Sequence, residues 1–122
     1  MAEDLLIVVR AACLALPETN ERLSHGVPCF FIRDKKSFLY YHDSHHNDGR
    51  LAIWCPAPPG VQEQMVEAEP ARYFRPAYVG HRGWIGLRLD IDRDDDEIVG
   101  VIDEAYRCIA PKTLLKLRDA TD

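Results

Sequence analysis

Apolar residues follow a helical period near the start of the chain. Between Asp4 and Leu16 they recur at Leu5, Val8, Val9, Ala12 and Leu16. This spacing places them on one face of an α-helix. Asp4 can cap the first turn, and Pro17 prevents the helix from continuing. The pattern therefore predicts a first helix with one wide buried face.

The next pattern is typical of β-strands. The segment VPCFFIRDKKSFLYYHDSHHNDGRLAIWC, from Val27 to Cys55, contains three short runs rich in aromatic and β-branched residues. The turn-forming stretches DKK and NDG separate these runs. We expect three antiparallel strands in meander order.

The second half of the chain returns to mixed elements. PAPPG interrupts the sheet, and Val61 to Glu69 can form a short helix that Pro70 ends. Two strands are expected next, a short one near Tyr78 and a longer one from Trp84 to Ile91. An acidic stretch then opens a helix with one apolar face, carried by Ile98, Ile102, Ala105 and Ile109. A final short helix is expected from Pro111.

The order of these elements predicts the fold class. Helix, three strands, helix, two strands and helix favour an α+β two-layer sandwich, α-β(3)-α-β(2)-α, with helices covering one face of an antiparallel sheet. Neither a repeat nor a long linker divides the chain, so we expect a single domain over residues 1–122.

Alternation along two strands assigns the face that the helices do not cover. In WIGLRLDI, the residues Ile85, Leu87, Leu89 and Ile91 share the inner face, which leaves Trp84, Gly86, Arg88 and Asp90 on the other. In RLAIWC the outward residues are Arg50, Ala52 and Trp54. These positions predict a shallow aromatic and basic surface. In the alternative arrangement, the last helix or the loop of residues 72–79 folds over the tryptophans.

Positive charge is concentrated in one stretch of the chain. Fifteen Lys and Arg against twenty Asp and Glu give a net charge of -5, which disfavours a polyanion unless positive charge gathers on one face. The stretch RYFRPAYVGHRGWIGLR, from Arg72 to Arg88, holds four arginines and no acid. Aromatic residues interleave with them, as in surfaces on which unpaired bases stack while arginines contact phosphate.

The residues offer no catalytic or metal-binding constellation. HDSHHNDG gathers histidines and aspartates at one turn, but a flexible polar turn does not hold ligands rigidly, so we expect no metal site. Ser24 and His25 are adjacent, which is not the arrangement of a catalytic triad. Gly80, Gly83 and Gly86 lack the strand-to-helix context of a dinucleotide loop. We expect neither enzyme activity nor a cofactor.

The cysteines and the N-terminal segment indicate a cytoplasmic protein. Four widely spaced cysteines stand beside apolar neighbours at Cys13, Cys29, Cys55 and Cys108, so we expect reduced and mostly buried thiols. The opening MAEDLLIVVRAACLAL carries acids where a secretory leader needs positive charge, and Arg10 interrupts its apolar run. We therefore expect no association with a membrane.

Three stretches resemble one known family. LPETNERLSHGVPCFFIRDKKSF, PAYVGHRGWIGLRLD and EAYRCIAPKTL are similar to the three ordered motifs of the MmcQ/YjbR-like proteins. The resemblance implies the same α-β(3)-α-β(2)-α plan, akin to secretion-chaperone-like folds, and a DNA-binding role through a proposed double-wing arrangement. It implies no catalytic residues. Two positions depart from the family pattern by lacking a lysine, Trp54 and His81.

These observations predict a non-enzymatic binding module. DNA or a single-stranded nucleic acid is the first expected ligand, through Arg72, Arg75, Tyr78, His81, Arg82, Trp84 and Arg88. The alternative is a partner protein or a second copy of the chain, through Arg50, Trp54, Trp84 and Arg88.

Overall fold

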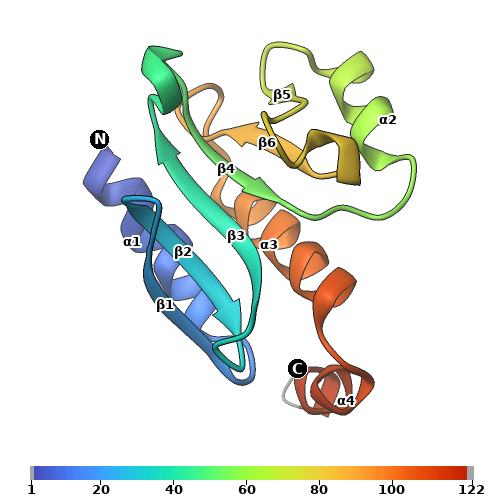
Figure 1. The fold of residues 1–122 in the computed structure, drawn as a ribbon. Helices are drawn as coiled ribbons and strands as arrows, with labels where there is room; N and C mark the ends of the chain where they lie inside the picture. The colour runs from blue at the N-terminus through green and yellow to red at the C-terminus, as the bar shows by residue number, and fades with distance from the viewer. Residues whose placement is uncertain (1, 121–122) are drawn as a thin grey trace.

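The computed structural model describes residues 2–120 as one antiparallel sheet with helices packed against it (Figure 1). In chain order its elements are α1 (Ala2–Leu14), β1 (Thr19–Ser24), β2 (Val27–Ile32), β3 (Lys36–Asp43), η1 (His45–Asn47), β4 (Leu51–Cys55), α2 (Val61–Ala68), β5 (Tyr73–Phe74), η2 (Gly80–Arg82), β6 (Ile85–Arg88), α3 (Asp95–Ile109) and α4 (Lys112–Ala120). The six strands lie in the order β1-β2-β3-β4-β6-β5. This arrangement confirms the predicted α+β class.

Strand β1 is an element that the sequence pattern did not reveal. Its segment TNERLS has one large apolar side chain, Leu23, and that side chain is 70% exposed. The strand forms because its backbone pairs with β2 from Thr19 opposite Ile32 to Ser24 opposite Val27. His25 and Gly26 join the two strands with φ angles of 54° and 80°, which is the geometry of a tight hairpin turn.

The two strands expected in the second half are displaced and shortened. The strand expected near Tyr78 lies instead at Tyr73–Phe74, while Tyr78 occupies a turn with a φ of 65°. The strand expected from Trp84 to Ile91 is limited to Ile85–Arg88. A left-handed φ excludes a residue from a regular strand, so the prediction for Tyr78 was wrong.

The main core lies between the sheet and the helices α1 and α3, which stand behind the sheet in Figure 1. The inward positions predicted from alternation are confirmed: Ile53 and Leu87 are buried in this core. On the helix side the core is formed by Val9 of α1 and by Ile102 and Tyr106 of α3. Within residues 2–120 no helix combines the length and apolarity needed to span a membrane.

The opposite face of the sheet is partly covered. Trp54 is 4% exposed and Trp84 is 3% exposed, so the expectation of an open aromatic surface at these two residues was wrong. The alternative in which the loop folds over the face is the one observed, because Phe74 and Val79 pack with Trp54 and Ala52. The last helix contributes to the main core instead, through Leu114.

A buried glutamine holds the covering segment in place. The side-chain amide of Gln62 on α2 donates hydrogen bonds to the carbonyl oxygens of Gly80, at 2.7 Å, and Trp84, at 2.6 Å. A buried amide that meets two backbone carbonyls satisfies groups that water cannot reach. Residues 80–84 are thereby fixed against the N-terminal turn of α2.

Candidate ligand-binding pocket

A cavity of about 630 Å³ lies on the sheet face turned away from α1 and α3. Four separate parts of the chain line it: the β1–β2 turn, the end of β3 with the adjoining η1, β4 and residues 77–79. We call it the aromatic pocket, after the rings that line it, which include those of Tyr40, His42, His45, Trp54 and Tyr78.

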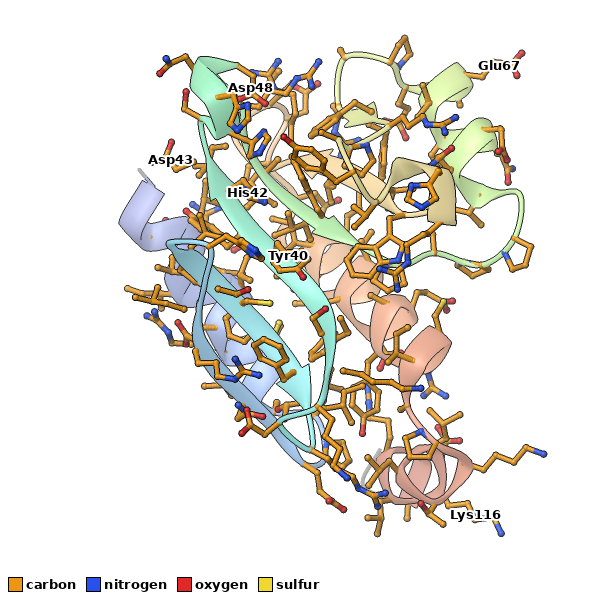
Figure 2. The ribbon with its side chains drawn as sticks, in the orientation of Figure 1. Tyr40, His42, Asp43, Asp48, Glu67 and Lys116 are labelled. Atoms are coloured by element: carbon orange, nitrogen blue, oxygen red, sulfur yellow. The ribbon has the colours of Figure 1, made fainter. Side chains whose placement is uncertain are left out.

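Strand geometry places three of these rings on the same face. In the sheet register Tyr40 pairs with Trp54, and directly paired residues point to the same side. His42 follows Tyr40 by two residues along β3 and therefore shares that side. Figure 2 shows Tyr40 and His42 succeeding one another along this strand, and Asp48 near the same end of the sheet. Asp43 follows His42 by one residue, so its side chain lies on the other face with that of its partner Leu51.

The rings form a connected cluster. The ring centroid of His42 lies 4.0 Å from that of Trp54, and His45 approaches the same indole at 4.7 Å. His45 also stacks on His46 at 4.0 Å and meets the ring of Tyr78 edge-on at 5.9 Å. Tyr78 is 71% exposed, so its ring stands at the mouth of the pocket.

The histidine turn is held by hydrogen bonds, contrary to the flexible loop expected from its composition. The backbone N–H of Ser44 donates to the carbonyl of Arg50 at 2.8 Å. The Ser44 hydroxyl accepts from the N–H of Gly49, and the Asp48 carboxylate accepts from the N–H of Arg50. Short polar side chains that bond to nearby backbone fix such turns. The ring of His45 consequently has a defined position against Trp54.

Burial keeps two of the imidazoles neutral at physiological pH. Removal from water, together with the adjacent His45, lowers the pKa of His42 to about 4. Burial and the neighbouring His46 also lower the pKa of His45. Neither lysine nor arginine lines the cavity. Asp43 is among the lining residues, but it pairs with Leu51 of the main core, so its side chain lies on the other face of the sheet. At neutral pH the imidazoles of His42 and His45 therefore enter the aromatic pocket as uncharged rings.

Ser24 and His25 also line this pocket. The structure brings the Ser24 hydroxyl to 3.2 Å from Nδ1 of His25, although the sequence argument had given this adjacent pair no catalytic geometry. Among residues 2–120 no carboxylate is paired with His25 to orient it. The pair therefore lacks the third member of a triad. The same residues contain no group of three or more histidine, cysteine or carboxylate side chains placed to hold a metal ion.

Most of the binding residues predicted from the arginine-rich stretch lie outside the aromatic pocket. Tyr78 of the expected nucleic-acid set and Trp54 of the expected partner set line the pocket. Arg72 is 14% exposed and forms ion pairs with Glu69 and Glu97, so it ties β5 to α3. The buried Nε of Arg88 has no hydrogen-bond partner within residues 2–120, and Asp90 lies 3.6 Å away.

The remaining positive residues of that stretch face solvent. Arg75, His81 and Arg82 are exposed. In the described part of the chain neither Arg75 nor Arg82 forms an ion pair, and Arg82 lies 5.1 Å from the ring centroid of Trp84. Arg50, from the expected partner set, covers the ring of Phe74 at 4.1 Å. The acid-free stretch therefore divides between structural ion pairing and exposed charge.

The cysteines are free thiols with different surroundings. Cys13, Cys29 and Cys55 are buried, whereas Cys108 is exposed. Burial raises the pKa of Cys29 to about 12. A buried thiol that stays protonated is a poor nucleophile, so Cys29 packs as a small apolar side chain beneath this face of the sheet.

Sequence reasoning missed the pocket because it treated the histidine turn separately from the sheet. Alternation along KSFLYYHD places Tyr40 and His42 on one side of β3, and the register places Trp54 on the same side. The floor of the pocket could therefore have been predicted from the sequence together with an assumed strand register. The position of Tyr78 at the mouth of the pocket could not be predicted, because a turn residue with positive φ belongs to no periodic pattern of apolar residues.

Comparisons with known proteins agree with this fold. A family model described as YjbR matches residues 14–108. The crystal structure of Deinococcus radiodurans protein DR2400, a DUF419 domain, is similar with a TM-score of 0.71 and 14% sequence identity, covering 88% of this chain and 83% of that one. None of the curated proteins matches the chain. At this level of identity the structural likeness shows a common fold.

Proposed function

The chain belongs to the YjbR family, and we propose that this member is a non-catalytic module that binds a small ring-containing ligand in the aromatic pocket. One observation carries the proposal: four segments of the chain, at residues 24–27, 40–46, 54 and 77–79, converge on one concave site of about 630 Å³. Binding sites for small molecules are commonly concave, of about 300–1,000 Å³, and lined by aromatic rings with a few polar groups.

The polar groups of the pocket are few and well placed to orient a ligand. Ser24 and His25, whose side chains lie 3.2 Å apart, belong to its lining beside the rings. The rings of Tyr78, which is 71% exposed, and of the half-buried Tyr40 and His45 are rigid and offer apolar faces. A ligand with one or two rings can exchange its hydration for these faces while a polar substituent reaches the rim.

A fragment screen tests the proposal. Soluble one-ring and two-ring compounds are screened against the full chain by ligand-observed NMR, and hits are ranked by their affinity. Replacing Tyr78 or His45 by alanine should weaken those hits about tenfold, because each residue contributes an aromatic face to the pocket. Leu117→Ala, an exposed apolar truncation on α4, is the matched control. The proposal would be contradicted if the hits bound both pocket variants with the same affinity as the wild type.

A second candidate function keeps the expected nucleic-acid ligand. The observation that favours it is that Arg75 and Arg82 are exposed and, among residues 2–120, have no acidic partner. Free guanidinium groups contact phosphates readily. This candidate uses a different set of residues from the aromatic pocket, so the two functions are tested separately.

Salt dependence tests the nucleic-acid candidate. Duplex and single-stranded DNA are titrated between about 50 and 200 mM salt, because phosphate contacts weaken steeply over this range. The double variant Arg75→Glu with Arg82→Glu should abolish binding. Lys35→Glu with Lys36→Glu supplies an equal change of charge where the β2–β3 turn enters β3. No binding at about 50 mM salt would rule out this candidate. Size-exclusion chromatography of the same samples tests the expected partner role as self-association.

A further inference from the structure

We propose that the aromatic pocket takes an uncharged ring compound that bears an amide-type group, and that the imidazole of His42 is the hydrogen-bond partner of that group. The proposal rests on the proposed function, since it assigns the ligand class of that same site. Three properties of the pocket support it: an imidazole with unpaired nitrogens, a lining that does not suit an ion, and accessible rings around the mouth.

The imidazole of His42 lines the cavity with its ring nitrogens unpaired. The residue is 9% exposed. Within residues 2–120 its ring contacts other rings, but its nitrogens form no hydrogen bond. The unpaired side-chain nitrogens and oxygens in this range that are fully shielded from water are Nε of Arg72 and Nε of Arg88. The nitrogens of His42 are therefore not fully enclosed, and they reach solvent through the cavity.

An imidazole in this position favours a ligand that supplies its missing hydrogen bond, because buried polar groups usually have a partner. Burial and the adjacent His45 lower the pKa of His42 to about 4, so the ring is uncharged at neutral pH. A neutral imidazole has one N–H donor and one nitrogen acceptor, and the hydrogen bond that it makes selects the tautomer. An amide both donates and accepts, so it can pair with whichever nitrogen faces the cavity.

The lining does not suit an ionic ligand. It contains neither lysine nor arginine, so an anion that enters would lose water without gaining either of these partners. The side chain of Asp43 lies on the other face of the sheet with that of Leu51, so a cation gains no carboxylate in the cavity. An uncharged ligand avoids both desolvation costs.

Accessible rings around the mouth can hold the ring of the ligand. His45 and His46 stack with their planes inclined by 11°. Tyr78, which is 71% exposed, meets both of them edge-on, at centroid distances of 5.9 Å and 6.4 Å. The half-buried Tyr40 also lines the cavity. A planar ligand can pack against these rings while its amide reaches the imidazole of His42.

Three planar probes of nearly one shape test the charge preference. At neutral pH benzamide, benzoate and benzamidine join the same ring to a neutral, an anionic and a cationic group. Each is titrated into the full chain by ligand-observed NMR. We expect benzamide to bind at least about tenfold more tightly than either ion. Equal or tighter binding of either ion would overturn the assignment of an uncharged ligand.

The nitrogen resonances of His42 test its role without any substitution. The resonance of an imidazole nitrogen moves when that nitrogen forms a hydrogen bond, so nitrogen NMR spectra of the isotope-labelled chain are recorded with benzamide and with toluene. We expect benzamide to move a His42 resonance much further than toluene does, because toluene has no hydrogen-bonding group. If benzamide binds and the His42 resonances do not move, another group holds the amide and the proposal is wrong.

Matched variants locate the effect at one imidazole. His42→Phe keeps a ring in the floor and removes both nitrogens, so it should weaken benzamide about tenfold and remove most of the preference for benzamide over toluene. His81→Phe makes the same replacement at an exposed histidine of η2, outside the pocket lining, and should change neither quantity. Unchanged affinity for benzamide in His42→Phe would overturn the role of His42.

Failure of this inference can be distinguished from failure of the proposed function. If benzamide does not bind while other ring-containing fragments do, the ligand class is wrong and the proposed function stands. If no fragment and no probe binds the pocket, the proposed function and this inference both fail.

Discussion

The imidazole of His42 lies against the indole of Trp54, with ring centroids 4.0 Å apart and planes inclined by 41°. This contact forms part of the pocket floor and holds a titratable group in a buried position. Because the cost of burial falls on the charged form of histidine, folding and protonation at this site are linked.

The first prediction concerns stability against pH. His42 has a pKa of about 4 in the folded protein, below its ordinary value near 6.5. Between these values the unfolded chain binds a proton that the folded chain does not, so the free energy of unfolding decreases as pH falls through this window. We expect a loss on the order of 2 kcal/mol between pH 7 and 5. Urea unfolding measures it.

The control for this prediction is His42→Phe, which keeps a ring against Trp54 and removes the titration. Its free energy of unfolding should fall less over the same pH interval. Equal losses in the variant and the wild type would show that other groups cause the pH dependence.

The second prediction concerns the buried amide of Gln62. Replacing Gln62 by alanine leaves the carbonyls of Gly80 and Trp84 without their donor, and we expect a loss of about 2–3 kcal/mol. Acrylamide should also quench the tryptophans more strongly, because the covering segment loses its attachment. Gln64→Ala, an exposed truncation on the same helix, should leave both quantities near the wild type. Unchanged quenching in Gln62→Ala would contradict this account.

The third prediction separates a structural arginine from an exposed one. Arg72 links Glu69 and Glu97, and the hydroxyl of Tyr73 donates to Glu97 at 2.9 Å. Arg72→Ala would leave two carboxylates facing a site without a cation, so we expect a loss of about 2–3 kcal/mol in urea unfolding. Arg75→Ala should cost less than about 0.5 kcal/mol. Similar costs for the two variants would mean that this ion-pair network contributes little.

The fourth prediction concerns a close approach in the sheet. A Cβ on Gly86 would lie 2.4 Å from ring atoms of Phe74, so Gly86→Ala forces the ring away from its packing against Trp54. We expect a loss of about 1–3 kcal/mol in thermal or urea unfolding. The double variant with Phe74→Leu should recover part of it, since the smaller side chain leaves room. Additive losses in the double variant would contradict the steric explanation.

The alternation of apolar residues along each strand was sufficient to predict which side chains face the core. Ile53 and Leu87 face the core because alternation leaves each strand residue one of two sides. Strand β1 was not predictable in this way, because an edge strand with polar side chains on both sides is stabilised by pairing with its neighbour. The alternation of apolar residues therefore predicts which strand side chains are buried, but it does not predict which strands pair.

The candidate site depended on contacts that no local pattern encodes. Trp54 alternates as an outward residue, yet it is buried because Phe74 and Val79 pack over the face. Arg72 stands beside exposed arginines in sequence and nevertheless pairs with Glu97, twenty-five residues away on α3. The absence of acids between Arg72 and Arg88 indicated a positive segment. Which of its arginines can bind a ligand depends, however, on where the fold places acidic side chains from other segments.

The two edges of the sheet restrict how copies of this protein can associate. At one edge β5 has only two residues. At the other, β1 carries Arg22, which is paired with Asp34, and Glu21, which is paired with Arg10. Short and charged edge strands resist the addition of a strand from another chain. Joining two sheets edge to edge into a continuous one is thus disfavoured, and a homodimer has to be built from side-chain surfaces.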